Sequence, residues 1–167
     1  MKKIIFEIYD RYTASHYRPI TKNAIMIRIL EPRGEDLYLL YPEKYKNILE
    51  VRFDDITEEI EDERYKDMFK LFNEDNFKDI LEFIKNNEFE ELIVHCNAGV
   101  SRSAAIMISL MKLINREDVV EEIIKSGRYV PNKLVLERFN EYAKGIKLSG
   151  YEDFMFTSDS LENWNLK

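Results

Sequence analysis

One nine-residue stretch carries most of the side chains that could do chemistry. It holds the only cysteine of the chain, with an arginine six positions later, and reads His95-Cys96-Asn97-Ala98-Gly99-Val100-Ser101-Arg102-Ser103. A thiol attacks as its thiolate, which nearby positive charge and a helix N-terminus both stabilise. The stretch therefore predicts a loop that binds a phosphate dianion, with Cys96 as the attacking group.

The other residues of this loop have separate expected tasks. Successive amides from Asn97 to Arg102, curled into a nest, present several donors to phosphate oxygens, and Gly99 supplies the backbone freedom that the curl needs. The Arg102 guanidinium adds a bidentate, charge-assisted pair to two of these oxygens. We expect Ser103 to donate a hydrogen bond to the sulfur when it leaves a covalent intermediate. We expect His95 to position the Cys96 backbone rather than to carry a proton.

Taken singly, each of these residues has an ordinary structural interpretation. A lone buried cysteine is most often a packing residue, and histidine and arginine are most often satisfied polar groups. Their combination weighs against that interpretation. The five types His, Cys, Gly, Arg and Ser at these offsets have a chance expectation on the order of 10⁻⁵, at an average usage of about one in twenty per residue type.

The loop lies between two elements that would position it. Residues 92–94 form a short apolar run typical of a buried strand, and residues 104–114 are apolar nearly all round, which is typical of a buried helix. A helix that begins just after the loop points the positive end of its dipole at a bound anion. This context is the one that the predicted chemistry requires.

A pair of carboxylates, Asp54 and Asp55, directly follows a strand pattern at residues 48–53. A thiolate that attacks a phosphate monoester expels an alkoxide or phenoxide, so a general acid must protonate the leaving oxygen. Either aspartate could supply that proton, and an acidic pair at a strand end can also form a turn or cap a helix. The residues alone leave this choice open.

The remaining patterns indicate an α/β layered domain, because strands come first and a strand-loop-helix crossover and several helices follow. Further strands are expected at 3–9, 24–30 and 37–41, and residues 11–22 form a loop or a short helix. Helices are expected after Asn73 as N-cap, after Asn115 with Asp118 as a capping pair, and from Pro131 in a first turn. Residues 57–67 are strongly acidic and expected to be solvated, and they precede an apolar patch at Met68, Phe69, Leu71 and Phe72.

Composition restricts the class of protein. The 167 residues, 45% of them hydrophobic, fit one globular domain, which we place at 1–150, with a tail at 151–167 that is either docked or flexible. A net charge of −7 argues against a nucleic-acid partner. Glu7 and Asp10 interrupt the first apolar run, so neither a signal peptide nor a membrane partner is expected. A free thiol suits a reducing compartment, and we expect a soluble, intracellular, cytoplasmic protein.

The motif VHCNAGVSRSAA closely resembles the signature of the dual-specificity branch of the cysteine-dependent protein tyrosine phosphatases. The stretch Tyr129-Val130-Pro131-Asn132, with Phe139 after it, resembles the Pro-Asn segment of that family. Residues 51–55 are similar to its general-acid segment. The resemblance covers residues 48–142 and extends to the first strands.

That resemblance implies a central, mostly parallel sheet of about four to five strands, flanked by helices. It implies hydrolysis through a phosphocysteine, with no metal and no cofactor. In such members the second acidic position usually carries the acid role, which favours Asp55 and leaves Asp54 as the second choice.

The implied substrate is a phosphorylated protein. The chain has no motif like the tyrosine loop that grips phosphotyrosine in the tyrosine-only branch. Phosphoserine and phosphothreonine are therefore expected substrates in addition to phosphotyrosine. Two alternatives remain open. The same chemistry could act on a phosphoinositide or an RNA 5′-phosphate, although these polyanions favour lysines that the loop does not contain. The domain could also bind phosphate without turnover, as a pseudophosphatase.

Overall fold

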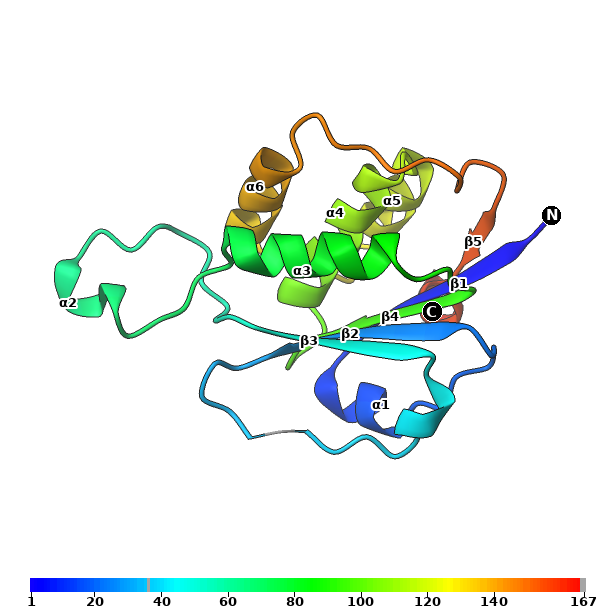
Figure 1. The fold of residues 1–167 in the computed structure, drawn as a ribbon, viewed down its shortest axis with the longest axis horizontal. Coiled ribbons are helices and arrows are strands. Elements are labelled where there is room, and N and C mark those ends of the chain that lie inside the picture. Colours follow the sequence, from blue (N-terminus) through cyan, green and yellow to red (C-terminus); the bar gives the residue numbers. More distant parts are fainter. Residues whose placement is uncertain (36, 166–167) are drawn as a thin grey trace.

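The computed structural model describes residues 1–35 and 37–165, and it describes residue 165 by its backbone alone. Five strands form one sheet in the order β3-β2-β4-β1-β5, and every pair of neighbours is parallel (Figure 1). The strands are β1 (Lys3–Tyr9), β2 (Ala24–Leu30), β3 (Asn47–Arg52), β4 (Glu91–His95) and β5 (Met155–Thr157). The expected α/β architecture, with a central and mostly parallel sheet of about four to five strands, is confirmed.

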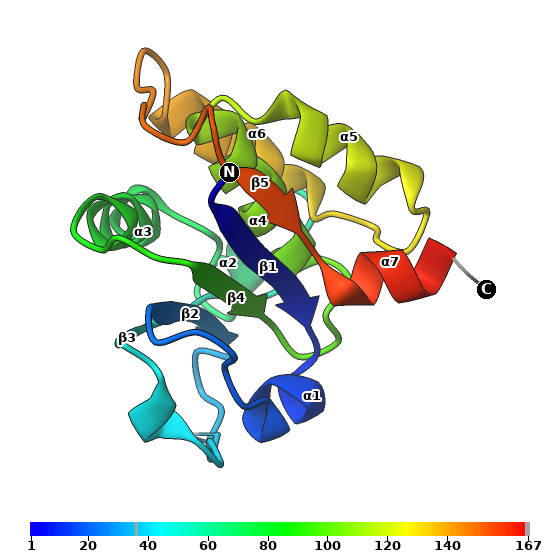
Figure 2. The same ribbon diagram turned by 90° about the vertical axis from the view of Figure 1, so that its right-hand side faces the viewer.

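Helices cover both faces of this sheet, which is what parallel strands with buried side chains on both faces require (Figure 1). On one face lie α3 (Glu74–Lys85), α4 (Arg102–Leu113), α5 (Glu117–Lys125) and α6 (Lys133–Tyr142), and on the other lies α1 (Arg11–His16). Figure 2 shows α7 (Asp159–Asn165) beside β1. Two short elements, η1 (Pro42–Lys44) and α2 (Glu63–Lys66), lie in connections.

Successive side chains along each strand point to opposite faces of the sheet, so the buried side chains belong to two separate cores. In β2, Ile25, Ile27 and Ile29 belong to the large core under α3 to α6, whereas Ala24 and Met26 belong to a smaller core with Ala14 of α1. In β4 the same alternation sends Val94 into the large core and Ile93 into the small one. Cys96, two positions after Val94, therefore lies on the α4 side of the sheet.

The carboxyl edge of the sheet contains a topological switch. β1 and β4 are neighbours, but β1 leads into α1 on one face and β4 leads into α4 on the other (Figure 1). Chains that leave adjacent strands in opposite directions open a crevice at the carboxyl ends, where open α/β sheets bind ligands. The cysteine loop, residues 96–101, leaves β4 at this switch point.

Three local expectations were wrong. Residues 37–41 form no strand: the Leu40 amide donates to Ser15 O, and Leu39 packs singly into the small core. Asn115 ends α4 in the left-handed region, with a φ of 62°, and does not cap α5. Pro131 lies just before α6, whose N-cap is Asn132.

The strands expected at 3–9, 24–30 and 48–53 and the Asn73 cap are confirmed, and residues 11–16 form α1. Beyond residue 150, β5 pairs with β1, and the buried carboxylate of Glu7 accepts hydrogen bonds from Ser158 and Ser160. Residues 151–161 thus pack on the body. The domain boundary at 150 stays a prediction.

Candidate active site

The Cys96 thiol lies at the bottom of the loop, 2% exposed, with two polar neighbours. The Gly99 amide donates to Sγ at 3.3 Å, and the Ser103 hydroxyl lies 3.1 Å from Sγ. Ser103 is in the first turn of α4, so the helix places its hydroxyl on the sulfur. Two donors at this distance suit a sulfur that carries negative charge.

Position 99 requires glycine for two reasons: its backbone conformation, and the lack of room for a side chain. Its φ is +69°, in the left-handed region that side chains disfavour. A Cβ at this position would lie 2.4 Å from the Asp10 amide nitrogen and 2.6 Å from the Tyr9 carbonyl carbon. The loop therefore packs directly on the backbone at the end of β1, which closes one side of the nest.

The carbonyl groups of the loop point outward and are held by neighbouring segments. Arg11 donates its amide to Asn97 O at 3.1 Å, Val130 to Val100 O at 3.1 Å, and Asn132 to Ser101 O at 3.0 Å. By contrast, no group in the described part of the chain accepts a hydrogen bond from the amides of Ala98, Val100, Ser101 and Arg102. A curl with its carbonyls engaged and its amides unused is a ready anion site.

The Arg102 guanidinium is 4% exposed and held from two sides. Nη1 donates to Phe53 O at 2.8 Å, and Nη2 donates to Glu31 Oε1 at 2.5 Å. Nε, which is also buried, has no hydrogen-bond partner among the described residues. A buried donor without a partner costs free energy, so an acceptor that binds this Nε would stabilise the site.

Glu31 was not among the predicted site residues. It follows β2 directly, and the carboxyl ends of parallel strands meet at one edge of the sheet. An acidic residue at that position was a usable signal, but the turn pattern Glu31-Pro32-Arg33-Gly34 concealed it.

The two aspartates after β3 face different partners. Asp54 joins Lys70, with its amide 2.7 Å from Lys70 O and its Oδ2 accepting from the Lys70 amide at 2.6 Å. Asp55 turns to the cysteine loop, where Oδ1 accepts from Ser101 Oγ at 2.8 Å and from Asn132 Nδ2 at 2.7 Å. Oδ2 of Asp55 accepts no hydrogen bond within the described residues. The structure thus brings Asp55 to the loop and uses Asp54 to close a connection.

His95 lies under the loop, fully buried, opposite Arg28 in the register of β2 and β4. Arg28 Nε donates to His95 Nε2 at 3.0 Å, and His95 Nδ1 lies 3.3 Å from Cys96 O. Because Nε2 must accept, the ring carries its proton on Nδ1 and donates it to the Cys96 carbonyl. Burial, followed by the positive charge of Arg28, lowers the pKa of His95 to about 4. The ring is therefore neutral near pH 7.

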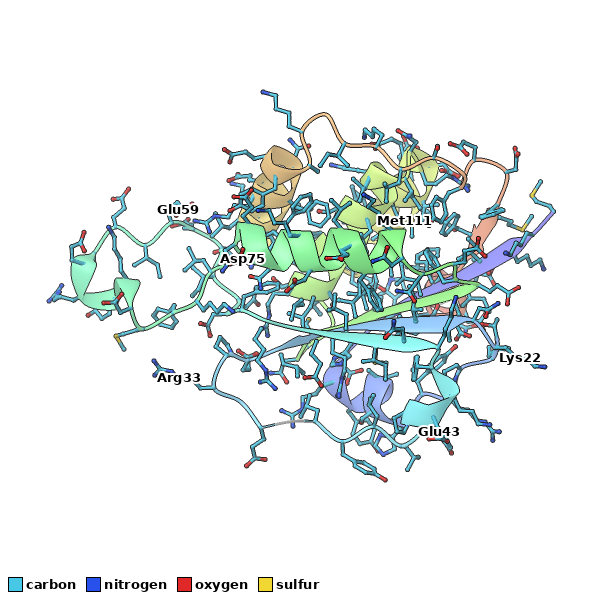
Figure 3. The ribbon with its side chains drawn as sticks, in the orientation of Figure 1. Lys22, Arg33, Glu43, Glu59, Asp75 and Met111 are labelled. Atoms are coloured by element: carbon cyan, nitrogen blue, oxygen red, sulfur yellow. The ribbon has the colours of Figure 1, made fainter. Side chains whose placement is uncertain are left out.

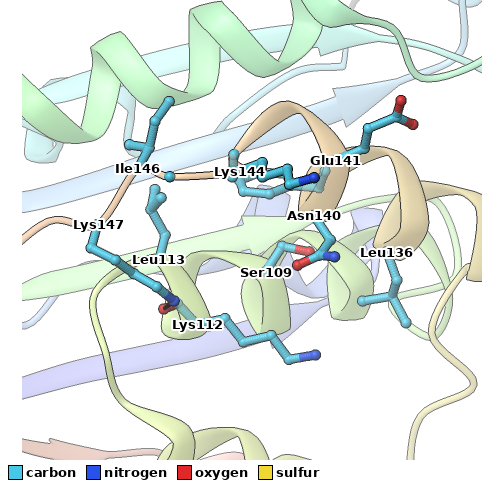
Figure 4. A pocket seen from close by; sticks show the side chains of 12 residues that line it. Ser109, Lys112, Leu113, Leu136, Asn140, Glu141, Lys144, Ile146 and Lys147 are labelled. Carbon is cyan, nitrogen blue, oxygen red and sulfur yellow. Dashed lines mark hydrogen bonds between the residues drawn. The ribbon is translucent and has the colours of Figure 1, made fainter.

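The described residues contain no cluster of three or more His, Cys, Asp or Glu side chains that could hold a metal ion. Within the same residues, no helix has the length and apolar character needed to cross a membrane. A cavity of about 480 Å³ lies between α4, α6 and residues 143–147 (Figure 4). Its walls include Ser109, Leu136 and Lys147 but no residue of the cysteine loop.

No protein-family model matches this chain, and no curated protein matches it. Among solved structures, the chain is similar to the human tyrosine phosphatase-like serine/threonine/tyrosine-interacting protein, with 20% identity, a TM-score of 0.43, and coverage of 74% of this chain and 78% of that one. It is similar to a mouse putative dual specificity phosphatase complexed with zinc tungstate, with 17% identity, a TM-score of 0.43, and coverage of 73% and 71%. The Yvh1 phosphatase domain from Chaetomium thermophilum follows, with 16% identity, a TM-score of 0.34, and coverage of 83% and 74%. At these identities the likeness says nothing of activity in this chain.

Proposed function

We propose that the protein is a phosphomonoester hydrolase that acts on phosphotyrosine, and also on phosphoserine and phosphothreonine, in proteins. The observation that carries the proposal is the buried Nε of Arg102, which has no partner in the described chain and lies on the first residue of α4, directly after the loop that carries the Cys96 thiol. The amides of Ala98, Val100, Ser101 and Arg102, in the same stretch of chain, also lack an acceptor among the described residues. A phosphoryl group supplies acceptors for all of these donors at once.

In the first step, the Cys96 thiolate attacks phosphorus and forms an S–P bond as the P–O bond to the leaving group breaks. The proton of the Asp55 carboxylic acid passes to the leaving oxygen, so that a neutral alcohol or phenol departs. The amides and Arg102 hold the phosphoryl oxygens, on which the transition-state charge resides. The nucleophile and the acid are both side chains, so the mechanism is metal-independent.

In the second step, water attacks the phosphocysteine, the Asp55 carboxylate takes a proton from the water, and the S–P bond breaks. The Cys96 thiolate returns with inorganic phosphate as the product. The Ser103 hydroxyl, 3.1 Å from Sγ, donates to the sulfur as it regains its charge. His95 holds the Cys96 carbonyl from below and takes no proton, because it stays neutral.

A thiolate nucleophile needs a reducing environment, because oxidation of the thiolate removes the nucleophile. The proposal therefore places the protein inside the cell, in the cytoplasm. Its substrate is a phosphorylated side chain at the surface of another protein.

The test is hydrolysis of an aryl phosphate and a phosphotyrosine peptide in the presence of a chelator, by the unmodified chain and by Cys96→Ser. We expect phosphate release by the first and none by the second. Because the chain has one cysteine, an acid-quenched reaction with labelled substrate should leave label on Cys96 alone. Undiminished turnover by Cys96→Ser would overturn the mechanism. Tight phosphopeptide binding without release by the unmodified chain would instead indicate a binding module.

A further inference from the structure

The connection between β3 and α3 projects from the carboxyl edge of the sheet and carries α2 at its tip (Figure 1). We call residues 56–70 the projecting segment. Asp54 and Lys70 close its base through two hydrogen bonds. Arg138 of α6 fastens it further, because Nη1 donates to Phe72 O at 2.6 Å and Nη2 to Glu59 at 2.8 Å. The segment is thus fixed beside Asp55.

A groove of about 380 Å³ separates the projecting segment from the turn after β2. Its lining residues include Glu31 and Arg33 of the turn, and Asp67, Met68, Phe69 and Lys70 of the segment. Figure 3 shows both walls at the same end of the molecule, with Arg33 on the turn and Glu59 on the segment. The groove adjoins the anion site, since Glu31 pairs with Arg102 and Asp54 precedes Asp55.

The groove offers apolar surface that nothing in the described chain covers. Met68 is 57% exposed and Phe69 is 41% exposed, and both line the groove. Phe72 of the same sequence patch is buried in the large core, so the patch is divided between core and surface. Two large apolar side chains left at the mouth of a binding site suit an apolar side chain of a ligand.

The charge of this region is strongly negative. Residues 54–70 contain eight acidic and three basic side chains. Two of the basic ones are already paired, Arg64 with Asp62 and Lys66 with Glu63. Glu58, Glu61 and Asp67 form no ion pair with any described residue, whereas Arg33 and Lys70 contribute positive charge only at the groove itself. A phosphate dianion that approaches this end of the molecule therefore meets net repulsion from the segment.

We propose that the projecting segment selects phosphoprotein sites that carry basic residues and one apolar residue close to the phosphorylated side chain. The apolar residue packs on Met68 and Phe69 in the groove. The basic residues offset the repulsion between the acidic segment and the phosphate and contact Glu58, Glu61 and Asp67. The same field disfavours polyanions such as a phosphoinositide or an RNA 5′-end. This inference rests on the proposed function and names its substrate class.

The test compares phosphotyrosine peptides of equal length with lysine or with glutamate at the flanking positions, by kcat/KM. We expect the basic peptide to be favoured by at least about tenfold at low ionic strength, and the ratio to fall as salt screens the segment. An aryl phosphate without flanking residues reports the chemistry separately. If the unmodified chain does not hydrolyse the aryl phosphate, the proposed function is wrong. If it does, but both peptides react at equal rates, or the acidic peptide or a phosphoinositide reacts faster, only the proposed substrate selection is wrong.

Two variants assign the effect to the segment. Glu58→Gln/Glu61→Gln/Asp67→Asn should bring the peptide ratio close to one, with aryl phosphate turnover unchanged. The matched control, Glu88→Gln/Glu121→Gln/Asp153→Asn, removes the same charge from exposed positions outside the segment and should keep the ratio. A ratio that survives in the first variant would contradict the proposal.

For the groove, Phe69→Ala should remove the preference for the apolar residue, measured with peptides that carry leucine or serine at that position. Ile124→Ala, at an exposed position of α5, should keep that preference. Equal loss in both variants, or no loss in Phe69→Ala, would show that the groove does not hold the peptide.

Discussion

The Asp55 carboxylate lies 2.7 Å from the side-chain nitrogen of Asn132, a residue 77 positions later in the chain. The same Asn132 caps α6 through the Val135 amide and gives its own amide to Ser101 O of the cysteine loop. One asparagine thus connects the end of β3, the start of α6 and the loop. Oδ1 of Asp55 is held in place, whereas Oδ2 accepts no hydrogen bond from the described residues, as the proposed role of Asp55 as general acid requires.

Asp55→Asn should lower kcat/KM for phosphotyrosine by roughly 10²–10⁴-fold, because an amide cannot protonate the leaving group. The loss should grow as the leaving group becomes more basic, which a series of aryl phosphates measures. Asp54→Asn should keep most of the activity, since Asp54 bonds to the Lys70 backbone rather than to the loop. A larger loss in Asp54→Asn than in Asp55→Asn would reverse the assignment.

Gly99→Ala should destabilise the protein by roughly 2–4 kcal/mol and abolish turnover, because it combines left-handed backbone strain with a clash. The added Cβ would clash with the Tyr9–Asp10 backbone, which cannot move aside as a flexible side chain could. Gly145→Ala is the matched control, since Gly145 also has a positive φ but a Cβ added there would meet no atom within 4 Å. Chemical denaturation of both variants separates the strain from the clash, and equal losses would mean that the loop adapts.

His95 should make the protein less stable in acid. Its pKa is about 4 in the folded chain and 6.5 as the reference value, so the unfolded chain binds the proton more readily. The contribution of this group is complete above about pH 6.5 and is lost as pH falls through about 4, by up to about 3 kcal/mol. Unfolding free energies of the unmodified chain and of His95→Gln, measured across this range, should differ in their slope against pH.

Nitrogen NMR should show a proton on Nδ1 of His95 and none on Nε2 at neutral pH. Equal slopes against pH, together with a protonated Nε2, would contradict the arrangement with Arg28.

Ser103→Ala should slow breakdown of the phosphocysteine more than its formation, because in the proposed mechanism the hydroxyl stabilises the departing thiolate. Rapid mixing with an aryl phosphate should then show a burst of phenol followed by slow turnover, with kcat reduced and kcat/KM nearly kept. Ser109→Ala, a buried serine further along the same helix, should behave like the unmodified protein. A fall in kcat/KM without a burst would assign Ser103 to the first step instead.

The candidate nucleophile, the arginine and the loop between a strand and a helix were predictable from the sequence, because they lie within nine consecutive residues. The strand and helix on either side were readable for the same reason, since their apolar patterns are local. The N-cap at Asn73 was also predictable from its neighbours alone. By contrast, the strand predicted at residues 37–41 is wrong, because Leu39 is buried by packing in the small core and not by pairing in the sheet. The three-residue β5 is too short for a period of two to be recognised.

Only the tertiary structure decided which distant groups meet at the loop. Asn132 donates a hydrogen bond that holds Asp55, and not Asp54, at the loop. Glu31 accepts the hydrogen bond from Arg102 Nη2. Arg28 donates to His95 Nε2 and so determines which ring nitrogen of His95 carries the proton. These partners lie between 67 and 77 positions away from the groups that they hold. The order β3-β2-β4-β1-β5 brings them together, since it places the ends of β2, β3 and β4 at one edge. Periodicity and spacing describe a segment and its neighbours, and the order of strands in a sheet is set by packing across the whole chain.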